Sequence, residues 1–220
     1  MISDATLADD EPLRARLLAA VLAEAAFEGL SARSLTLACK AEGLDPVEAE
    51  IAFPGGIRDL IDYWNGRCDQ AVLDAMAGPD IAAMKVRERI AFGVRTRLMA
   101  AAEHREAVRR ALGLLALPQN ALTGTRLLYR TVDAIWWAAG DRSTDWNFYS
   151  KRGLLAAVYS STLLFWLDDR SDGFSESWAF LDRRIAEVMK VPGQMAKLKT
   201  VAAKLGGLVP PSVKARFAQG

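Results

Sequence analysis

The chain has 220 residues, of which 51% are hydrophobic and 25% are charged, a composition that excludes a disordered protein and provides for a sizeable core. Its 28 basic and 27 acidic residues nearly balance, which excludes a protein that coats nucleic acid through its overall charge. Residues 190–220 nevertheless hold six basic residues and no acidic one, so a basic tail follows an acidic body.

The first third of the chain is predicted to be helical, because apolar residues recur about every 3.6 positions and no run alternates as in a strand. Helices are expected over residues 12–28, 34–40, 46–53 and 57–76. Ser34 is the expected N-cap of the second helix, and Asp45 followed by Pro46 is typical of the start of the third.

The same period continues through the rest of the chain, with breaks at Gly78-Pro79 and Pro192-Gly193. Helices are expected over residues 81–102, 104–116, 120–139, 145–167 and 174–189, followed by a tail helix. The longest uncharged stretch, residues 153–167, is shorter than the roughly 20 apolar residues of a membrane span, so a buried helix is expected there. The predicted fold is all-α: a short N-terminal bundle, a larger C-terminal helical bundle and an amphipathic tail helix.

The sequence lacks the patterns that catalysis and metal binding require. His104, its single histidine, has no carboxylate three residues before it, so the Glu-x-x-His pattern of helical metal sites is absent. Cys39 and Cys68 have no Cys-x-x-Cys partner, which indicates small buried side chains in a reducing compartment. The carboxylate pair Asp168-Asp169, at a helix end, is expected to be structural. We therefore expect no enzyme, no metal and no cofactor.

Three short helices before residue 53, followed by Phe53-Pro54-Gly55-Gly56 and a long helix, resemble the N-terminal domain of TetR-type regulators. Residues 34–53 would form the helix-turn-helix, and residues 46–53 its recognition helix. This helix carries Glu48 and Glu50 but no basic residue, and residues 31–60 hold three basic against five acidic residues. Because DNA affinity comes from neutralising phosphate charge, we expect no nucleic-acid binding. A ligand-responsive regulator of the TetR type remains the alternative function.

The basic tail is predicted to form an amphipathic helix. Its apolar residues fall within one arc of a helical wheel, bordered by lysines. Lysines in such positions can reach lipid head groups while the apolar stripe enters the acyl boundary. The residues expected to touch a membrane are Met195, Lys197, Leu198, Val201, Lys204 and Leu205. A helix docked on the protein's own acidic body is the alternative.

Residues 139–152, AGDRSTDWNFYSKR, continued by LLAAVY at 154–159 and by WAFLDRRI at 178–185, closely resemble the ubiquinone-biosynthesis accessory proteins. The resemblance implies a TetR-like fold without DNA binding, a bound isoprenoid or phospholipid, and a homodimer through the late helices. It also implies a non-catalytic accessory role: the protein presents a polyprenyl-quinone intermediate to the di-iron demethoxyubiquinone hydroxylase at the membrane surface. The acidic N-terminus lacks a secretory or mitochondrial targeting pattern, so the expected location is the bacterial cytoplasm, peripheral on the inner face of the cytoplasmic membrane.

The resemblance also assigns functional residues by position. The hydroxylase-facing patch corresponds to Asp145, Phe148, Tyr149 and Arg152, where the family often has tryptophan in place of Phe148. Candidates for the lipid chamber are the apolar positions Met99, Leu128, Ile135, Val158, Leu163 and Trp166, for each of which ordinary core is the alternative. The expected organisation is a degenerate helix-turn-helix part over 1–56, a lipid-binding and dimerisation bundle over 57–190, and a membrane-contact tail over 191–220. A scaffold without a cavity is a further alternative.

Overall fold

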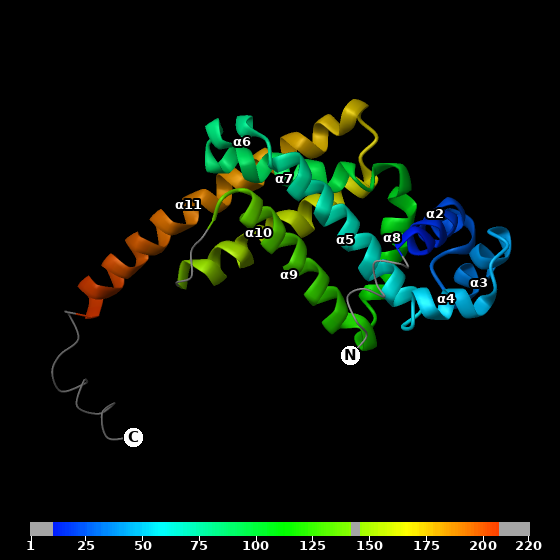
Figure 1. Ribbon diagram of the computed structural model, residues 1–220. Coiled ribbons are helices and arrows are strands. Elements are labelled where there is room, and N and C mark those ends of the chain that lie inside the picture. The colour runs from blue at the N-terminus through cyan, green and yellow to red at the C-terminus, as the bar shows by residue number, and fades with distance from the viewer. Residues whose placement is uncertain (1–10, 142–145, 207–220) are drawn as a thin grey trace, which may run out of the picture.

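The computed structural model describes residues 11–141 and 146–206, with the side chains of Pro79, 146–149 and 191–206 outside the description. Over these residues the protein consists of ten α-helices and three short 3-10 helices, with no strand. Figure 1 shows the N-terminal helices at one end of the molecule and the end of the last helix at the other. The predicted all-α architecture is therefore confirmed.

The N-terminal end is built from α2 (Glu11–Glu28), α3 (Ala32–Ala41) and α4 (Pro46–Ala52). The predicted cap of α3 is wrong by one turn: Ser31, not Ser34, is the N-cap. The Ser34 N–H donates to Ser31 Oγ at 3.2 Å, and the Ser31 N–H donates to Ser34 Oγ at 2.9 Å. This reciprocal pair satisfies two backbone donors at once, which explains why the helix begins earlier than expected.

The start of α4 agrees with the sequence. Asp45 Oδ1 accepts a hydrogen bond from the Val47 N–H at 2.8 Å, while Glu48 Oε2 accepts one from the Asp45 N–H at 2.8 Å. Pro46 occupies the first helical position, where its missing N–H costs nothing. The pair α3 and α4 thus has the helix-turn-helix arrangement that the sequence predicts.

The middle of the chain forms α5 (Ile57–Met76), α6 (Pro79–Ala83), α7 (Val86–Met99), η1 (Ala102–His104), α8 (Arg105–Leu115), η2 (Pro118–Asn120) and α9 (Ala121–Ala138). The helix expected over 81–102 is divided, because the backbone is extended at Met84 and Lys85. Arg89 holds this break: its guanidinium donates to the carbonyl oxygens of Met84 at 3.0 Å and Ala82 at 2.8 Å. Carbonyls that a continuous helix would pair internally are thereby satisfied by a side chain.

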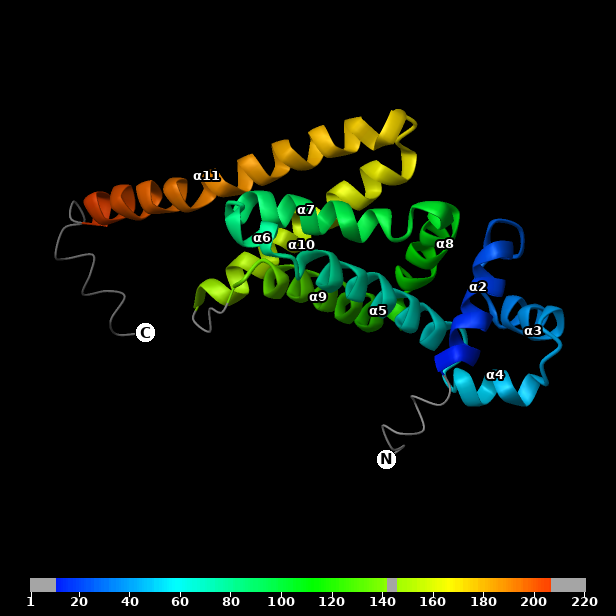
Figure 2. The same ribbon diagram turned by 45° about the horizontal axis from the view of Figure 1, so that its top comes forward.

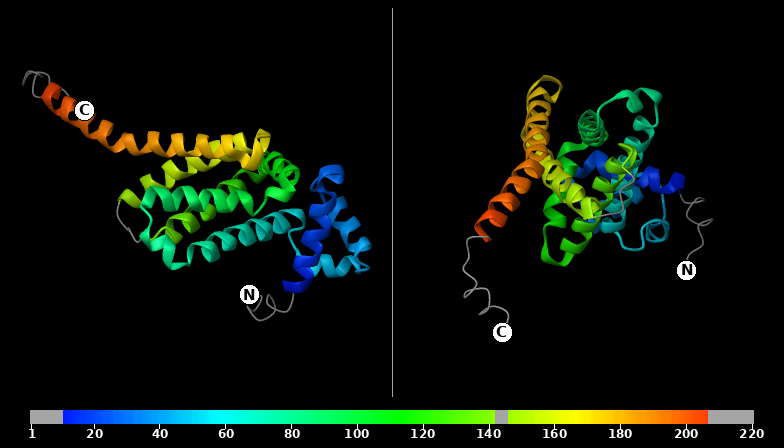
Figure 3. Two further views of the ribbon diagram at one scale, coloured as in Figure 1. Left: turned by 90° about the horizontal axis from the view of Figure 1, so that it is seen from above. Right: turned by 90° about the vertical axis from the view of Figure 1, so that its left-hand side faces the viewer.

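The chain ends in α10 (Trp146–Asp168), η3 (Asp172–Phe174) and α11 (Ser175–Gly206). The break expected at Pro192-Gly193 is absent, and α11 continues through it. A proline removes one helical hydrogen bond, but the turns on either side can continue. Figures 2 and 3 show that the backbone of the last turns of α11 extends away from the bundle.

Two apolar cores share α5. Leu60, Ile61 and Trp64 pack into a core with α2, α3, α4 and α8, whereas Val72 and Met76 pack into a second core with α7, α9, α10 and α11. The helix therefore joins the helix-turn-helix part to the larger bundle through its own buried face. None of the described helices is long and apolar enough to cross a membrane.

Candidate ligand cavity

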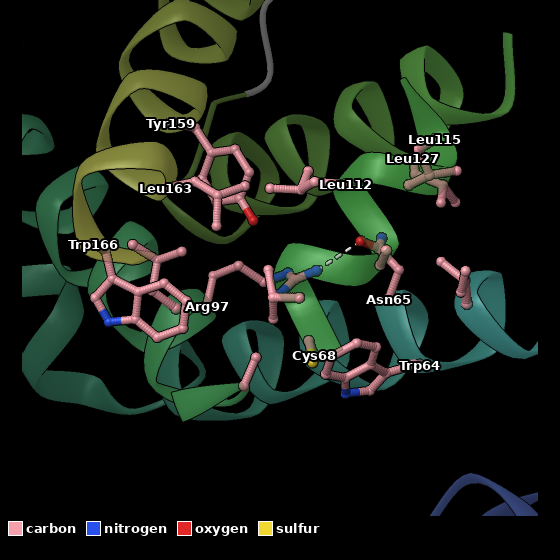
Figure 4. A pocket seen from close by; sticks show the side chains of 15 residues that line it. Trp64, Asn65, Cys68, Arg97, Leu112, Leu115, Leu127, Tyr159, Leu163 and Trp166 are labelled. Atoms are coloured by element: carbon pink, nitrogen blue, oxygen red, sulfur yellow. Dashed lines mark hydrogen bonds between the residues drawn. The ribbon is translucent and has the colours of Figure 1, made fainter. Parts of the chain in front are cut away.

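A cavity of about 80 Å³ lies where α5, α7, α8, α9 and α10 meet, and Figure 4 shows the side chains around it. Apolar side chains form most of its wall: Ile61, Trp64, Leu98, Leu112, Leu163 and Trp166. Trp166 and Leu98 are almost completely buried, so this wall belongs to the protein interior. The cavity therefore lies among interior side chains and is mostly apolar.

A groove of about 400 Å³ adjoins the cavity between α8, α9 and α10. Six residues line both spaces: Asn65, Leu112, Leu115, Leu127, Tyr159 and Leu163. Leu164, which also lines the groove, is 61% exposed, so the groove opens to solvent. The cavity thus shares a wall of side chains with a larger apolar groove of a size typical of ligand sites.

A buried polar cluster borders the cavity. Arg97 Nε donates to Asp69 Oδ1 at 2.7 Å, and Arg97 Nη2 donates to Asn65 Oδ1 at 2.6 Å. Asn65 Nδ2 in turn donates to Asp69 Oδ2 at 2.9 Å and to Thr131 Oγ1 at 3.2 Å, and Thr131 Oγ1 donates to Asp69 Oδ1 at 2.8 Å. This network compensates the cost of burying the Arg97–Asp69 ion pair and fixes the guanidinium at the cavity wall.

The protonation states in this region follow from burial and charge. Burial by itself would lower the pKa of Arg97, but the nearby Tyr159, Cys68 and Asp69 raise it above its usual value. Burial raises the pKa of Tyr159 and that of Cys68, although Arg97 opposes both shifts. Arg97 is therefore a cation, while the Tyr159 hydroxyl and the Cys68 thiol keep their protons at neutral pH.

The predicted lipid-contacting residues are brought together only in part. Leu163 and Trp166 line the cavity, and Leu128 and Leu163 line the groove. Val158 lines a separate apolar groove of about 230 Å³ between α7, α9, α10 and α11.

Two of the predicted chamber residues lie elsewhere. Met99 is 49% exposed, and Ile135 is fully buried against Gly93, where it fills the core. The expectation that they face the chamber is therefore wrong. Residue type and period alone do not distinguish a cavity wall from a filled core or from the exposed end of a helix.

Sequence reasoning missed the polar residues of the cavity: Asn65, Arg97 and Tyr159. Charged and amide side chains are usually at the surface, so a helical wheel assigns them to solvent. One signal was present. Asn65 lies beside the apolar stripe of α5 that includes Trp64 and Cys68, and Asp69 follows it after one turn. A polar pair on an apolar face predicts a buried network.

The predicted partner patch lies largely outside the described side chains. Asp145 precedes the described part of α10, and Phe148 and Tyr149 are in its first turn, where only the backbone is described. Arg152 is described, and its side chain is only 5% exposed. Its Nη2 lies 2.6 Å from Asp133 Oδ1, so Arg152 joins α10 to α9. The expectation that Arg152 belongs to an exposed patch is wrong, because its ion pairs hold it inside.

The other residues that the sequence singled out have structural surroundings. Cys39 and Cys68 are free thiols in the interior, as expected, and burial is the main cause that raises the pKa of each. Within the described part of the chain, no three His, Cys, Asp or Glu residues are grouped so that they could hold a metal ion. All the residues predicted to touch a membrane, from Met195 to Leu205, belong to α11. The structure describes their backbone but not their side chains.

Comparison with known proteins supplies independent information. A family model described as COQ9 matches residues 121–192. "Ubiquinone biosynthesis protein COQ9, mitochondrial" from Rattus norvegicus is 30% identical over 202 residues, which cover 89% of this chain and 65% of the relative. The corresponding Homo sapiens protein is 29% identical over 89% of this chain and 64% of its own length. The chain thus spans less than two thirds of these two relatives.

A TetR transcriptional regulator from Nitrosomonas europaea has a similar structure, with a TM-score of 0.66 and 21% identity, covering 80% of this chain and 97% of the regulator. This similarity confirms the predicted TetR-like fold and concerns the fold alone.

The predicted bacterial location is contradicted by the names of the relatives with similar sequences. The relatives from Rattus norvegicus, Homo sapiens, Drosophila melanogaster and Dictyostelium discoideum are all named as mitochondrial. The prediction depended on the missing targeting pattern at the N-terminus, which is a property of one short segment and not of the fold.

The match to Xenopus laevis is the most extensive of those described. "Ubiquinone biosynthesis protein COQ9-B, mitochondrial" is 30% identical over 217 residues, which cover 91% of this chain and 71% of the relative. Together with the family match over residues 121–192, which include α9, α10 and the start of α11, this match shows that the chain belongs to the COQ9 family.

Proposed function

We propose that this chain is a non-catalytic accessory protein of ubiquinone biosynthesis. It binds a polyprenyl-quinone intermediate and presents it at a membrane surface to the di-iron demethoxyubiquinone hydroxylase. The names of its relatives support a role in this pathway. The observation that carries lipid binding is the apolar groove of about 400 Å³ that shares a wall with the internal cavity.

The groove suits a hydrocarbon chain because leucine side chains form much of its wall: Leu112, Leu115, Leu127, Leu128, Leu163 and Leu164. Moving one methylene group from water to an apolar surface is favourable by about 0.8 kcal/mol, so several isoprene units gain strongly from such a groove. The presence of the cavity and the groove favours a lipid carrier over a scaffold without a cavity.

The end of α11 supports contact with a membrane. The backbone of this helix continues past the bundle, as Figure 3 shows, and the helix includes the apolar and lysine positions of the predicted amphipathic segment. A helix of this composition lies in the interface of anionic lipid, with each nearby lysine adding about 1 kcal/mol. The proposed function therefore assigns membrane contact to the last turns of α11.

The first turn of α10 is the proposed docking site for the hydroxylase, with Phe148 and Tyr149 as its apolar anchors beside Asp145. Aromatic residues are enriched among the hot spots of protein interfaces. Arg152 contributes indirectly, since its ion pair with Asp133 positions this turn relative to α9. Large exposed side chains on α9 and α10, among them Leu122 and Leu164, support a homodimer through these late helices.

The alternative function, a DNA-binding regulator, has little support beyond the fold. The expected recognition helix α4 carries two glutamates and no basic residue, and it exposes the apolar side chains of Val47 and Ile51. Phosphate contacts require the opposite character.

Lipid extraction from the gently purified protein, followed by mass spectrometry, tests the proposed function. We expect a co-purifying isoprenoid in the wild type and its loss in Thr125→Trp, because residue 125 lines the groove and a bulky side chain there fills it. Thr123→Trp is the matched control, on the same helix but outside the groove wall. A wild-type protein that is consistently empty, or equal lipid loss in both variants, contradicts the proposal.

A further inference from the structure

Two hydrogen-bond donors face the cavity without partners among the described residues. Arg97 uses Nε and Nη2 in its bonds to Asp69 and Asn65, and none of its bonds engages Nη1. The Tyr159 hydroxyl likewise has no hydrogen-bond partner in the described part of the chain. Both side chains are more than nine-tenths buried. Neither donor atom is sealed off by protein atoms, so a molecule that occupies the cavity can accept hydrogen bonds from both.

The two donors converge on the same space. Figure 4 shows Tyr159 entering from α10 with its hydroxyl turned toward the guanidinium of Arg97, which enters from α7. The two residues also influence each other's pKa. Asn65, the third polar residue of the wall, has its amide oxygen and nitrogen both engaged within the network. Trp166 Nε1 also has no hydrogen-bond partner among the described residues, but Figure 4 shows it on the side of its ring away from Arg97. Recognition beside the polar network therefore depends on Arg97 and Tyr159, both of which can donate.

The charge of the surroundings limits the kind of group that fits. Arg97 is already paired with Asp69, and Arg130, whose Nε lies 3.5 Å from Asp69 Oδ2, is also paired with Asp62. Arg126 also pairs with Asp62, but its side chain is 66% exposed, so solvent screens its charge. Among the buried groups, the guanidinium of Arg97 faces the carboxylate of Asp69, which leaves no excess buried positive charge for an anion. An anionic ligand would lose its hydration without an opposing net charge, whereas a neutral oxygen needs only the hydrogen bonds.

We propose that Arg97 and Tyr159 form a recognition site for an uncharged head group that carries acceptor oxygens, such as a carbonyl, phenol or ether oxygen on a ring. The head lies at the cavity, and the apolar chain leaves through the groove between α8, α9 and α10. This inference rests on the proposed function and deepens it, because it specifies which end of the lipid is inside. The cavity measures about 80 Å³, so only a small head group fits without movement of the wall. A complete ring binds by displacing the flexible leucine side chains that the cavity shares with the groove.

Isothermal titration calorimetry with three probes tests the site: decylbenzoquinone, decylbenzene and decylbenzoate. These share a chain and a ring and differ in head-group chemistry. For the wild type we expect the quinone to bind more tightly than either the hydrocarbon or the carboxylate. Tyr159→Phe removes one hydroxyl and should weaken quinone binding by roughly two- to tenfold, as for one neutral hydrogen bond, and leave decylbenzene unchanged. Tyr129→Phe, an exposed tyrosine on α9 outside the cavity, is the matched control.

Arg97→Lys keeps the charge opposite Asp69 but replaces the forked guanidinium by a single ammonium nitrogen, so the donor at the Nη1 position is lost and quinone binding should weaken to a similar extent. Should this variant fail to fold, Tyr159→Phe carries the test alone. If the wild type binds none of the probes, the lipid-binding proposal fails together with the head-group site. If the wild type binds decylbenzene and the quinone equally, and Tyr159→Phe changes neither, lipid binding stands and the head-group site is overturned. Tightest binding of decylbenzoate also overturns it.

Discussion

Asp169 illustrates how much one buried carboxylate contributes to the late bundle. It follows α10 and is 4% exposed. Its Oδ1 accepts from the N–H of Ser171 at 2.7 Å and from its hydroxyl at 2.6 Å, and its Oδ2 accepts from the N–H of Ser177 at 2.9 Å and from its hydroxyl at 2.5 Å. Burial alone would raise the pKa of Asp169, but these bonds lower it to about 2. The carboxylate thus fixes the connection between α10 and α11.

Asp169→Asn should lower the free energy of unfolding at pH 7 by about 2 kcal/mol, because a pKa lowered from 3.8 to about 2 stabilises the folded state by that order. The contribution is complete above the unfolded pKa and is lost as the pH falls from 3.8 to about 2. Urea unfolding at pH 7 and at pH values through this window measures it: the difference between wild type and variant should shrink with acidity. Asp168→Asn, with a side chain 78% exposed, is the control and should change stability little. A pH-independent difference contradicts the prediction.

The capping of α3 shows how an element is delimited by side chains. The reciprocal bonds between Ser31 and Ser34 satisfy two of the donors that the helix start leaves open. α3 lies in the core of the N-terminal end through Leu35, Ala38 and Cys39, so its start determines how α2 and α4 meet it.

Ser31→Ala should destabilise the protein by about 1 kcal/mol, the usual value for loss of an N-cap side chain. Thermal unfolding followed by circular dichroism measures the change. Thr36→Ala is the control, because Thr36 lies in the same helix and its hydroxyl only donates to the Ala32 carbonyl at an exposed position. Equal effects of the two substitutions would show that Ser31 does not cap the helix.

At the scale of the whole molecule, the two ends differ in character. The N-terminal helices surround a closed core joined to the bundle through α5, whereas α11 leaves the bundle at the opposite end, as Figure 1 shows. The proposed lipid site lies between these ends. The molecule therefore combines a body with two apolar cores and one helix whose backbone continues beyond the bundle.

Removal of residues 191–220 should abolish binding to vesicles that contain anionic lipid and leave the free energy of unfolding of the body nearly unchanged. The reason is that the backbone of the deleted turns of α11 extends away from the bundle, as Figure 3 shows. Vesicle co-sedimentation at low and high salt, combined with urea unfolding, measures both quantities. Replacement of Lys197 and Lys204 by glutamine in the full chain should weaken binding mainly at low salt, since exposed charges are screened. Undiminished vesicle binding by the truncated chain contradicts the assignment of membrane contact to α11.

The sequence by itself determined the helical class, the start of α4 at Asp45-Pro46 and the limits of α5. These depend on local patterns: apolar period, capping residues and glycine or proline at the ends. The resemblance over residues 139–189 also identified the family correctly. Each of these features is encoded within a few turns of chain.

Only the tertiary structure decided which residues surround the cavity. Trp166 lines the cavity while Ile135 is solid core, although both are fully buried apolar residues on neighbouring helices, and Arg97 and Arg152 are buried although arginine is usually exposed. Burial of a charge depends on a partner from another helix, Asp69 for Arg97 and Asp133 for Arg152, and such pairings join residues far apart in the chain. A periodic pattern predicts which face of each helix is buried, but it does not predict the distance between the buried faces of neighbouring helices. That distance decides whether the space between them is a ligand cavity or a filled core.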